Sequence, residues 1–199
     1  MSQVQAQNLT QILQERFSPQ IIGVHAYRGQ QTMVIKREGL LEVARFLRDD
    51  STTAFDFLMD LSAVDYLKFG ISQHSSPTLK TPSPLPYYMN PKSVTETWDR
   101  LVSNDEYRFD VVYHFYSTTH HHRLRLKVPL TIADPVVDSL TELWVSANWF
   151  EREIWDMFGI QFTGHPDLRR ILMYPEFKGH PLRKDYPVRK RQPLIGPIN

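Results

Sequence analysis

In the segment from residue 123 to residue 130, RLRLKVPL, the basic residues Arg123, Arg125 and Lys127 alternate strictly with Leu124, Leu126 and Val128. Such alternation is typical of a strand with one face in a core and the other face exposed. The segment 108–117, RFDVVYHFYS, is a second strong strand, and the short linker STTHHH allows the two to form a hairpin. The sequence therefore predicts an antiparallel strand pair as the centre of the fold.

The remaining patterns surround this pair with short elements. Helices are predicted at 8–17, 39–47 and 136–144, and strands at 21–26, 32–36 and 55–66. Because strands and helices do not follow a βαβ rhythm, we expect an α+β fold. It should contain a small mixed or mainly antiparallel sheet with flanking helices, followed by an extended C-terminal arm.

We expect two parts: an α+β body over residues 1–147, and a helix with an extended docking arm over residues 148–199. A proline-rich stretch at about 68–92 interrupts the body and shows no periodic pattern. A surface insertion explains it better than a proline-rich ligand for a recognition domain.

The chain lacks the residue patterns of common catalytic and cofactor sites. It contains no cysteine, which excludes thiolate nucleophiles and cysteine-held zinc or iron–sulfur clusters in this chain. Its glycines form no phosphate-binding loop, and there is no nucleophile elbow. His120, His121 and His122 are adjacent, so they cannot all converge on one metal, and a polar turn is favoured. We therefore predict no catalytic, cofactor-binding or metal-binding residue.

No run approaches the roughly 18 to 20 apolar residues of a membrane helix, and the N-terminus resembles neither a secretory signal nor a transit peptide. The sequence therefore predicts a protein that faces the cytosol and associates with membranes only through partners.

A further helix is predicted from Asn148, where Asn148 and Glu151 resemble a capping box, to a stop at Gly159. One face carries apolar residues and the opposite face carries Arg152, Glu153 and Asp156, with Arg152 and Asp156 spaced as an i,i+4 ion pair.

Glu151 lies at the edge of the apolar sector. Two interpretations stay open for it: helix capping with a favourable dipole interaction, or an ion pair with a partner or with the following basic loop.

After this helix, Gly-His-Pro occurs twice, at 164–166 and 179–181, and each copy leads into basic residues. Residues 178–199 contain six Lys or Arg residues and one acid, Asp185. Fully extended at about 3.1 Å per residue, this tail would reach roughly 70 Å. It could be a solvated tail, a nucleic-acid arm or an arm that binds another protein; the interleaved Tyr174, Phe177 and Tyr186 favour a protein partner.

The run ERE at 151–153, DMF at 156–158, His165, the motif Arg169-x-Ile-Leu and the continuation GHPLRKDYP resemble the signature of one family. This is the thirty-kilodalton subunit, or C subunit, of bacterial NADH:quinone oxidoreductase, also called NDH-1 or respiratory complex I. The resemblance is strong over 136–187 and weaker over 55–66 and 108–130.

The resemblance implies a non-catalytic core subunit of the peripheral arm, bound to the D subunit. This neighbour is of the forty-nine-kilodalton type and helps to form the quinone site, so we call it the quinone-site subunit. The parent complex passes electrons from NADH through FMN and iron–sulfur clusters, all in partner subunits, to quinone, and it couples this transfer to proton translocation. The resemblance also implies a peripheral location at the cytoplasmic face of the bacterial inner membrane, and no nucleic-acid partner.

Carried over by position, the signature residues become structural and interface residues. They are Glu151, Arg152, Glu153, Asp156, His165, Arg169, His180, Arg183, Lys184 and Asp185. The alternatives are the equivalent subunit of a membrane-bound hydrogenase or of a ferredoxin- or F420-linked dehydrogenase, and a nucleic-acid-binding protein.

Overall fold

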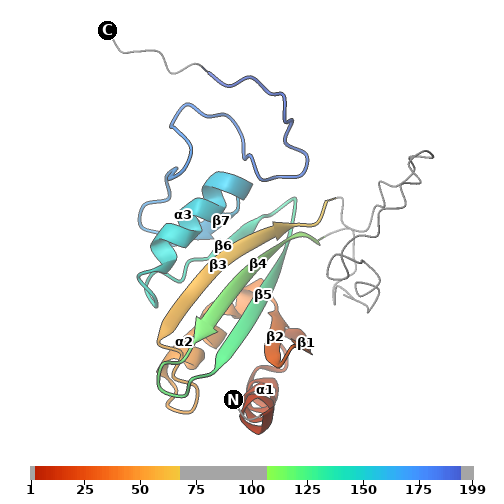
Figure 1. Cartoon of the computed structure of the whole chain (residues 1–199), viewed down its shortest axis with the longest axis vertical. Helices are drawn as coiled ribbons and strands as arrows, with labels where there is room; N and C mark the ends of the chain where they lie inside the picture. The colour runs from red at the N-terminus through yellow and green to blue at the C-terminus, as the bar shows by residue number, and fades with distance from the viewer. Residues whose placement is uncertain (1–2, 68–106, 194–199) are drawn as a thin grey trace, which may run out of the picture.

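The computed structural model describes residues 3–67 and 107–193 (Figure 1). In chain order the elements are α1 (Gln3–Phe17), β1 (Ile21–Tyr27), β2 (Gln30–Ile35), a 3₁₀ turn η1 (Arg37–Gly39), α2 (Leu40–Asp49), β3 (Phe57–Asp65), β4 (Tyr107–Tyr116), β5 (Arg123–Thr131), β6 (Val136–Asp138), α3 (Ala147–Phe158) and β7 (Gln161–Thr163). The proline-rich stretch at 68–92 lies outside the described residues.

Five strands form the central sheet in the order β1-β2-β5-β4-β3. The pairs β1·β2, β4·β5 and β3·β4 are antiparallel, whereas β2 and β5 run parallel. The predicted hairpin of β4 and β5 is therefore confirmed, and the sheet is mixed. Together with three α-helices, this sheet confirms the α+β fold class.

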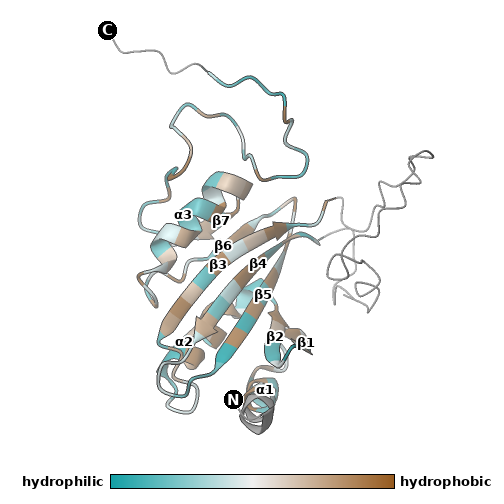
Figure 2. Ribbon diagram, viewed as in Figure 1, coloured by the Kyte–Doolittle hydropathy of each residue, from teal (hydrophilic) through white to brown (hydrophobic). Residues whose placement is uncertain are grey.

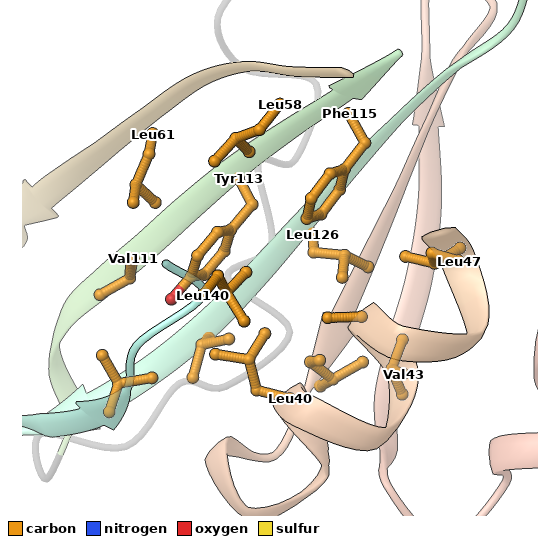
Figure 3. Close-up of a cluster of buried hydrophobic side chains, with 14 of the residues drawn as sticks. Leu40, Val43, Leu47, Leu58, Leu61, Val111, Tyr113, Phe115, Leu126 and Leu140 are labelled. Carbon is orange, nitrogen blue, oxygen red and sulfur yellow. The ribbon is translucent and has the colours of Figure 1, made fainter. Parts of the chain in front are cut away.

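The core lies on one face of this sheet. The apolar side chains of β5, Leu124, Leu126 and Val128, are 2% exposed or less, as their alternation predicts. They pack with β4 side chains such as Tyr113 and with α2, which covers the same face (Figure 3). α3 lies beside the edge strand β3 and adds side chains to the same core (Figure 1).

The prediction of a helix at 136–144 is wrong. Val136–Asp138 instead forms β6, which pairs in parallel with β7, and residues 141–143 form a turn. The β-branched pair Val136-Val137 suits a strand. The indole Nε1 of Trp144 donates a hydrogen bond to the carbonyl of Phe55, so this turn is fixed to the body instead of continuing as a helix.

The predicted start of α3 is also corrected. The helix begins at Ala147 with Ser146 as the preceding residue, so Asn148 lies inside it and does not cap it. Its predicted end is confirmed, because Gly159 adopts a left-handed conformation with φ of 74°.

Beyond β7, residues 164–193, which we call the return segment, contain no helix or strand. The segment turns back beside α3 and β3 before it extends away (Figure 1). The division of the chain at residue 147 stays a prediction.

Candidate docking site around helix α3

Glu151 is completely buried, and it stabilises the turn that precedes α3. One carboxylate oxygen accepts a hydrogen bond from the Ser139 hydroxyl at 2.6 Å, and the other accepts the backbone N–H of Leu140 at 2.7 Å. Burial raises the pKa of Glu151 to about 7, although both hydrogen bonds act in the opposite direction. Glu151 therefore forms neither of the interactions that the sequence suggested: it caps a neighbouring turn, and within the described residues it has no ion-pair partner.

Tyr113 lies in the core near this carboxyl group, with its hydroxyl directed toward the Leu140 region (Figure 3). Within the described residues its hydroxyl is buried and has no hydrogen-bond partner. Burial, and then the negative charges of Glu151 and Asp138, raise the pKa of Tyr113 well above its ordinary value. A polar atom without a partner is costly in a core, and the sequence pattern indicated only that Tyr113 faces inward.

Asp156 holds the return segment on α3. Its carboxylate accepts the backbone N–H groups of Ile171, Leu172 and Met173 and pairs with the Arg170 guanidinium. Burial alone would raise the pKa of Asp156, but the N–H of Met173 and Arg170 outweigh it and lower the pKa. The carboxylate is therefore an anion bound by successive backbone donors.

Arg152 does not form the predicted ion pair with Asp156. Its Nε and Nη2 atoms donate to the carbonyl oxygens of Arg169 and Arg170, and its guanidinium lies 5.2 Å from the Trp149 ring centroid. The predicted polar face of α3 is thus covered by the return segment, and Arg152 and Asp156 are buried. Glu153 is exposed, as predicted.

Two histidines fix the two Gly-His-Pro turns. His165 accepts the N–H of Asp167 at Nδ1, so its Nε2 carries the proton and donates to the carbonyl of Asn148 at 3.2 Å. His180 Nδ1 lies 3.0 Å from the carbonyl of Asp156 and donates to it. Both imidazole rings therefore bind α3 backbone carbonyls.

Gly159 has a second role besides ending the helix. A Cβ atom at this position would lie 2.6 Å from the His180 ring and 2.9 Å from an Arg183 nitrogen. Any larger residue would therefore push these two side chains of the return segment away from α3.

The second Gly-His-Pro turn leads to an ion-pair network on the body. Arg183 donates through Nε to the carbonyl of Phe158, and the N–H of Lys184 donates to Asp65 at 2.8 Å. Arg108 lies at a register shift of β4 and makes a bidentate pair with Asp65 and another with Asp185.

These two carboxylates raise the pKa of Arg108 above its ordinary value. Arg108 and Asp65 were not singled out from the sequence. The one pattern that could have indicated this ion pair is the presence of a basic and an acidic residue at the facing ends of two strands.

The side chain of Arg169 contributes little to stability in the described part of the chain, since its only ion pair there, to Asp167 at 2.9 Å, joins two exposed side chains.

The predicted interface aromatics are half-buried and not fully exposed. Phe177 packs against Tyr174 and Tyr186, with ring centroids 5.6 and 6.1 Å apart, because the segment folds back on itself.

The three adjacent histidines belong to the body. His120 and His122 bind the carbonyl oxygens of Ser51 and Thr53, each at 2.9 Å, while His121 occupies a turn with φ of 53°. The predicted polar turn is correct for His120 and His121, but His122 is buried. Within residues 3–67 and 107–193, no group of three potential metal ligands occurs.

Several large apolar side chains stay exposed around α3 and the return segment. We call them the α3 surface; its members, with exposed fractions, are Val145 (86%), Trp149 (63%), Leu172 (56%), Leu182 (50%) and Val188 (97%). The partly buried hydrogen bonds of Arg152, Asp156 and His180 hold the return segment, and with it part of this surface, against α3. Exposed apolar side chains on a fixed backbone are typical of protein interfaces.

In the part of the chain that the structure describes, no helix is long and apolar enough to cross a membrane.

Comparison with known proteins is consistent with these features. The chain is 40% identical over 189 residues to the C subunit of NADH-quinone oxidoreductase from Citrifermentans bemidjiense, with 94% of each protein aligned. It is 40% identical to the protein of the same name from Coxiella burnetii, over 92% of this chain and 78% of that protein.

Two solved structures are similar in fold. The trypsin-resistant fragment of Nqo5 matches with a TM-score of 0.56 and 28% identity, over 80% of this chain and 98% of that chain. A chain of the membrane-bound sulfane sulfur reductase, an archaeal respiratory membrane complex, matches with a TM-score of 0.63 over 92% of this chain and 86% of that chain. At 16% identity it supports the fold alone.

The family described as "Respiratory-chain NADH dehydrogenase, 30 Kd subunit" matches residues 33–192. This match covers most of the chain, including β3, β4, β5, α3 and nearly all of the return segment, while β1 lies before it. The chain therefore belongs to the family of the thirty-kilodalton subunit of respiratory-chain NADH dehydrogenase, which includes the C subunits of NADH-quinone oxidoreductases.

Proposed function

We propose that this chain is a non-catalytic scaffold in the peripheral arm of an NADH:quinone oxidoreductase, where the α3 surface binds the quinone-site subunit. Membership of the complex follows from the family, and other subunits of the complex are its partners. FMN and the iron–sulfur clusters would reside in partner subunits, since this chain has no cysteine to hold a cluster.

The main observation behind this proposal is that the α3 surface is apolar and exposed, while the hydrogen bonds of Asp156 and Arg152 hold its backbone in place. Trp149, Leu172 and Leu182 are each at least 50% exposed, although large apolar side chains are normally buried. Next to them, the buried residues Asp156 and Arg152 fix the return segment through partly buried hydrogen bonds. A preformed surface loses little conformational entropy on binding.

The end of the return segment extends this surface with positive charge. Val188 is 97% exposed and is followed by three exposed cations, Arg189, Lys190 and Arg191. Up to Asp185 the segment is held by Arg108, so the arm leaves the body from a fixed point. An apolar anchor followed by cations fits a partner surface that combines an apolar groove with acidic residues.

Glu151 has the raised pKa that is typical of catalytic acids, but its position argues against catalysis. The side chain is fully buried, and its two oxygens already accept hydrogen bonds from Ser139 and Leu140. A carboxyl group without access to a substrate cannot act on one, so we assign Glu151 a structural role.

A substitution at Leu182 tests the α3 surface, with Ile132 as the matched control. Both are exposed aliphatic residues, at 50% and 54%, but Ile132 follows β5 and lies outside the α3 surface. In cells that carry the other subunits, Leu182→Asp should lower the amount of quinone-site subunit that co-purifies with this chain and lower NADH:quinone activity. Ile132→Asp should change neither. Normal co-purification and activity of Leu182→Asp would overturn the proposal.

Within this proposal the chain lies at the cytoplasmic face of the inner membrane and reaches the membrane only through its partners. NADH-dependent quinone reduction by the purified assembly separates this function from that of a related hydrogenase or a ferredoxin- or F420-linked dehydrogenase. Binding to DNA or RNA that weakens steeply between about 50 and 200 mM salt would instead support a nucleic-acid protein.

A further inference from the structure

The face of the central sheet opposite the core carries no helix of the described residues. In Figure 1, α2 lies behind the sheet, whereas β3, β4 and β5 are uncovered on the viewer's side. β3 shows the same asymmetry, since Leu58 and Leu61 are buried while Phe57, Ser62 and Val64 are exposed. We call this side of the sheet the open face.

Positive charge is concentrated on the middle strand of the open face. Arg123, Arg125 and Lys127 alternate along β5 with the buried leucines and valine. Hydrophilic teal segments alternate with brown ones on β5 in Figure 2. Lys127 lies 3.8 Å from Asp110, but within residues 3–67 and 107–193 neither arginine has a carboxylate at ion-pair distance.

Among the described residues, the contacts of these two arginines are with neutral or aromatic groups. Arg125 donates to the side-chain oxygens of Gln30 and Thr32 at 3.2 and 3.5 Å, and Arg123 lies 5.6 Å from the centroid of the Tyr116 ring. Their charges are therefore available to an external anion.

Strand pairing places Arg125 at the centre of a row of polar side chains across the sheet. His25 pairs with Thr32, Thr32 with Arg125, Arg125 with His114, and His114 with Asp60. Burial lowers the pKa of both histidines, and the charge of Arg125 lowers it further, together with Lys127 in the case of His25.

A pocket of about 240 Å³ opens on this row and is lined by Asp60, His114, Arg123 and Arg125, among others. The pocket is large enough to accept a side chain that carries a carboxylate. Asp60 is the single acid of this lining, against two arginines.

Exposed apolar side chains surround the charged row. On the same face, Tyr27, Phe57, Met59 and Val64 are 36 to 49% exposed. Arginine, tyrosine, phenylalanine and methionine are the residues that protein interfaces favour, and burying such a patch requires a partner surface and not a small anion.

We propose that the open face is a second docking surface, which binds a protein segment carrying an acidic side chain flanked by apolar residues, from another subunit of the assembly. A nucleic acid fits less well, because Asp60 and Asp110 lie on the same face and the chain has a net charge of only +1. This inference rests on membership of a multisubunit complex, and it does not depend on the role of the α3 surface.

The absence of cysteine makes a direct test possible. Ser62 is exposed on the open face, so Ser62→Cys introduces a single thiol whose reaction with a maleimide can be followed on this chain. In the intact complex the thiol should react at least about tenfold more slowly than in the free full-length chain, because a covered site reacts only after local opening. Equal rates would overturn the proposal and leave the α3 surface unaffected.

A carbodiimide, which joins an amine directly to a carboxylate, tests the chemistry of the occupant. Arg125→Lys places an amine in the pocket, and Arg45→Lys places one on exposed α2 as a matched control. In the complex, Lys at position 125 should form a cross-link to an Asp or Glu of a different subunit that Arg45→Lys does not form. The proposal would be overturned if no such cross-link formed, or if the cross-link joined a second copy of this chain. It would also be overturned if nuclease treatment abolished the protection of Ser62→Cys.

Discussion

The buried carboxyl group of Glu151 makes folding stability depend on pH in a direction unusual for an acid. Its pKa is raised from 4.5 in the unfolded chain to about 7 in the folded protein. The unfolded state therefore releases its proton first as the pH rises, so the stability contributed by this group is complete below pH 4.5 and is lost up to and through pH 7. Once the group is ionised in both states, the loss amounts to about 3 kcal/mol.

The variant Glu151→Gln should remove this dependence. A glutamine amide can accept the N–H of Leu140 through its oxygen and donate to the Ser139 hydroxyl, as the protonated acid would, and it cannot ionise. We expect equal stability of the two proteins near pH 4.5. At pH 8.5 the variant should be more stable by up to about 3 kcal/mol, or roughly 6 to 12 °C in Tm for a chain of this size.

Urea unfolding of the full-length chain at several pH values between 4.5 and 8.5 measures this difference. Glu142→Gln is the control, because Glu142 is an exposed acid in the turn that Glu151 caps, and its substitution should leave the pH dependence of the wild type unchanged. A difference between wild type and Glu151→Gln that is the same at all pH values would refute the reasoning.

Three further substitutions test the packing. Gly159→Ala should lower the free energy of unfolding by more than about 1 kcal/mol, because position 159 has a left-handed φ and the added Cβ would meet the His180 ring. Limited proteolysis should then cleave the return segment faster than in the wild type. Tyr113→Phe should be neutral or stabilising by up to about 1 to 2 kcal/mol in urea unfolding, because it removes a buried hydroxyl without a partner; a large loss would reveal a hydrogen bond that it makes. Arg108→Ala should destabilise by about 3 to 5 kcal/mol in thermal unfolding, because it leaves the buried Asp65 without its cation, and an unchanged Tm would contradict this.

Local patterns were sufficient to predict much of the fold. The alternation along Arg123–Thr131 predicts both the strand and its buried face, and Gly159 predicts the end of α3. The parallel pairing of β2 with β5 could not be predicted, because the choice of a neighbouring strand depends on contacts between residues distant in the sequence.

The sequence identified residues of the candidate site but did not predict which groups they contact. The i,i+4 spacing of Arg152 and Asp156 favours an ion pair on an isolated helix. Each instead binds residues of the return segment that lie 14 to 18 positions further along the chain. A helical wheel treats this face as exposed and cannot register a segment that folds back over it. The same limitation concealed the role of Glu151, whose partners precede the helix.

The most direct test of the central claim is a truncation after Tyr186, which removes Val188 and the exposed cations while keeping the Arg108–Asp185 pair. The truncated chain should still fold, because Asp156 and Arg108 continue to hold the return segment. Its Tm should fall only slightly, because most of the hydrogen bonds that it loses, between residues 190–193 and Tyr174 or Lys178, are exposed. In cells that express the other subunits, the quantity to measure is the amount of quinone-site subunit that co-purifies with it. The account predicts a clear loss of that subunit and of NADH:quinone activity; full retention of both would contradict it.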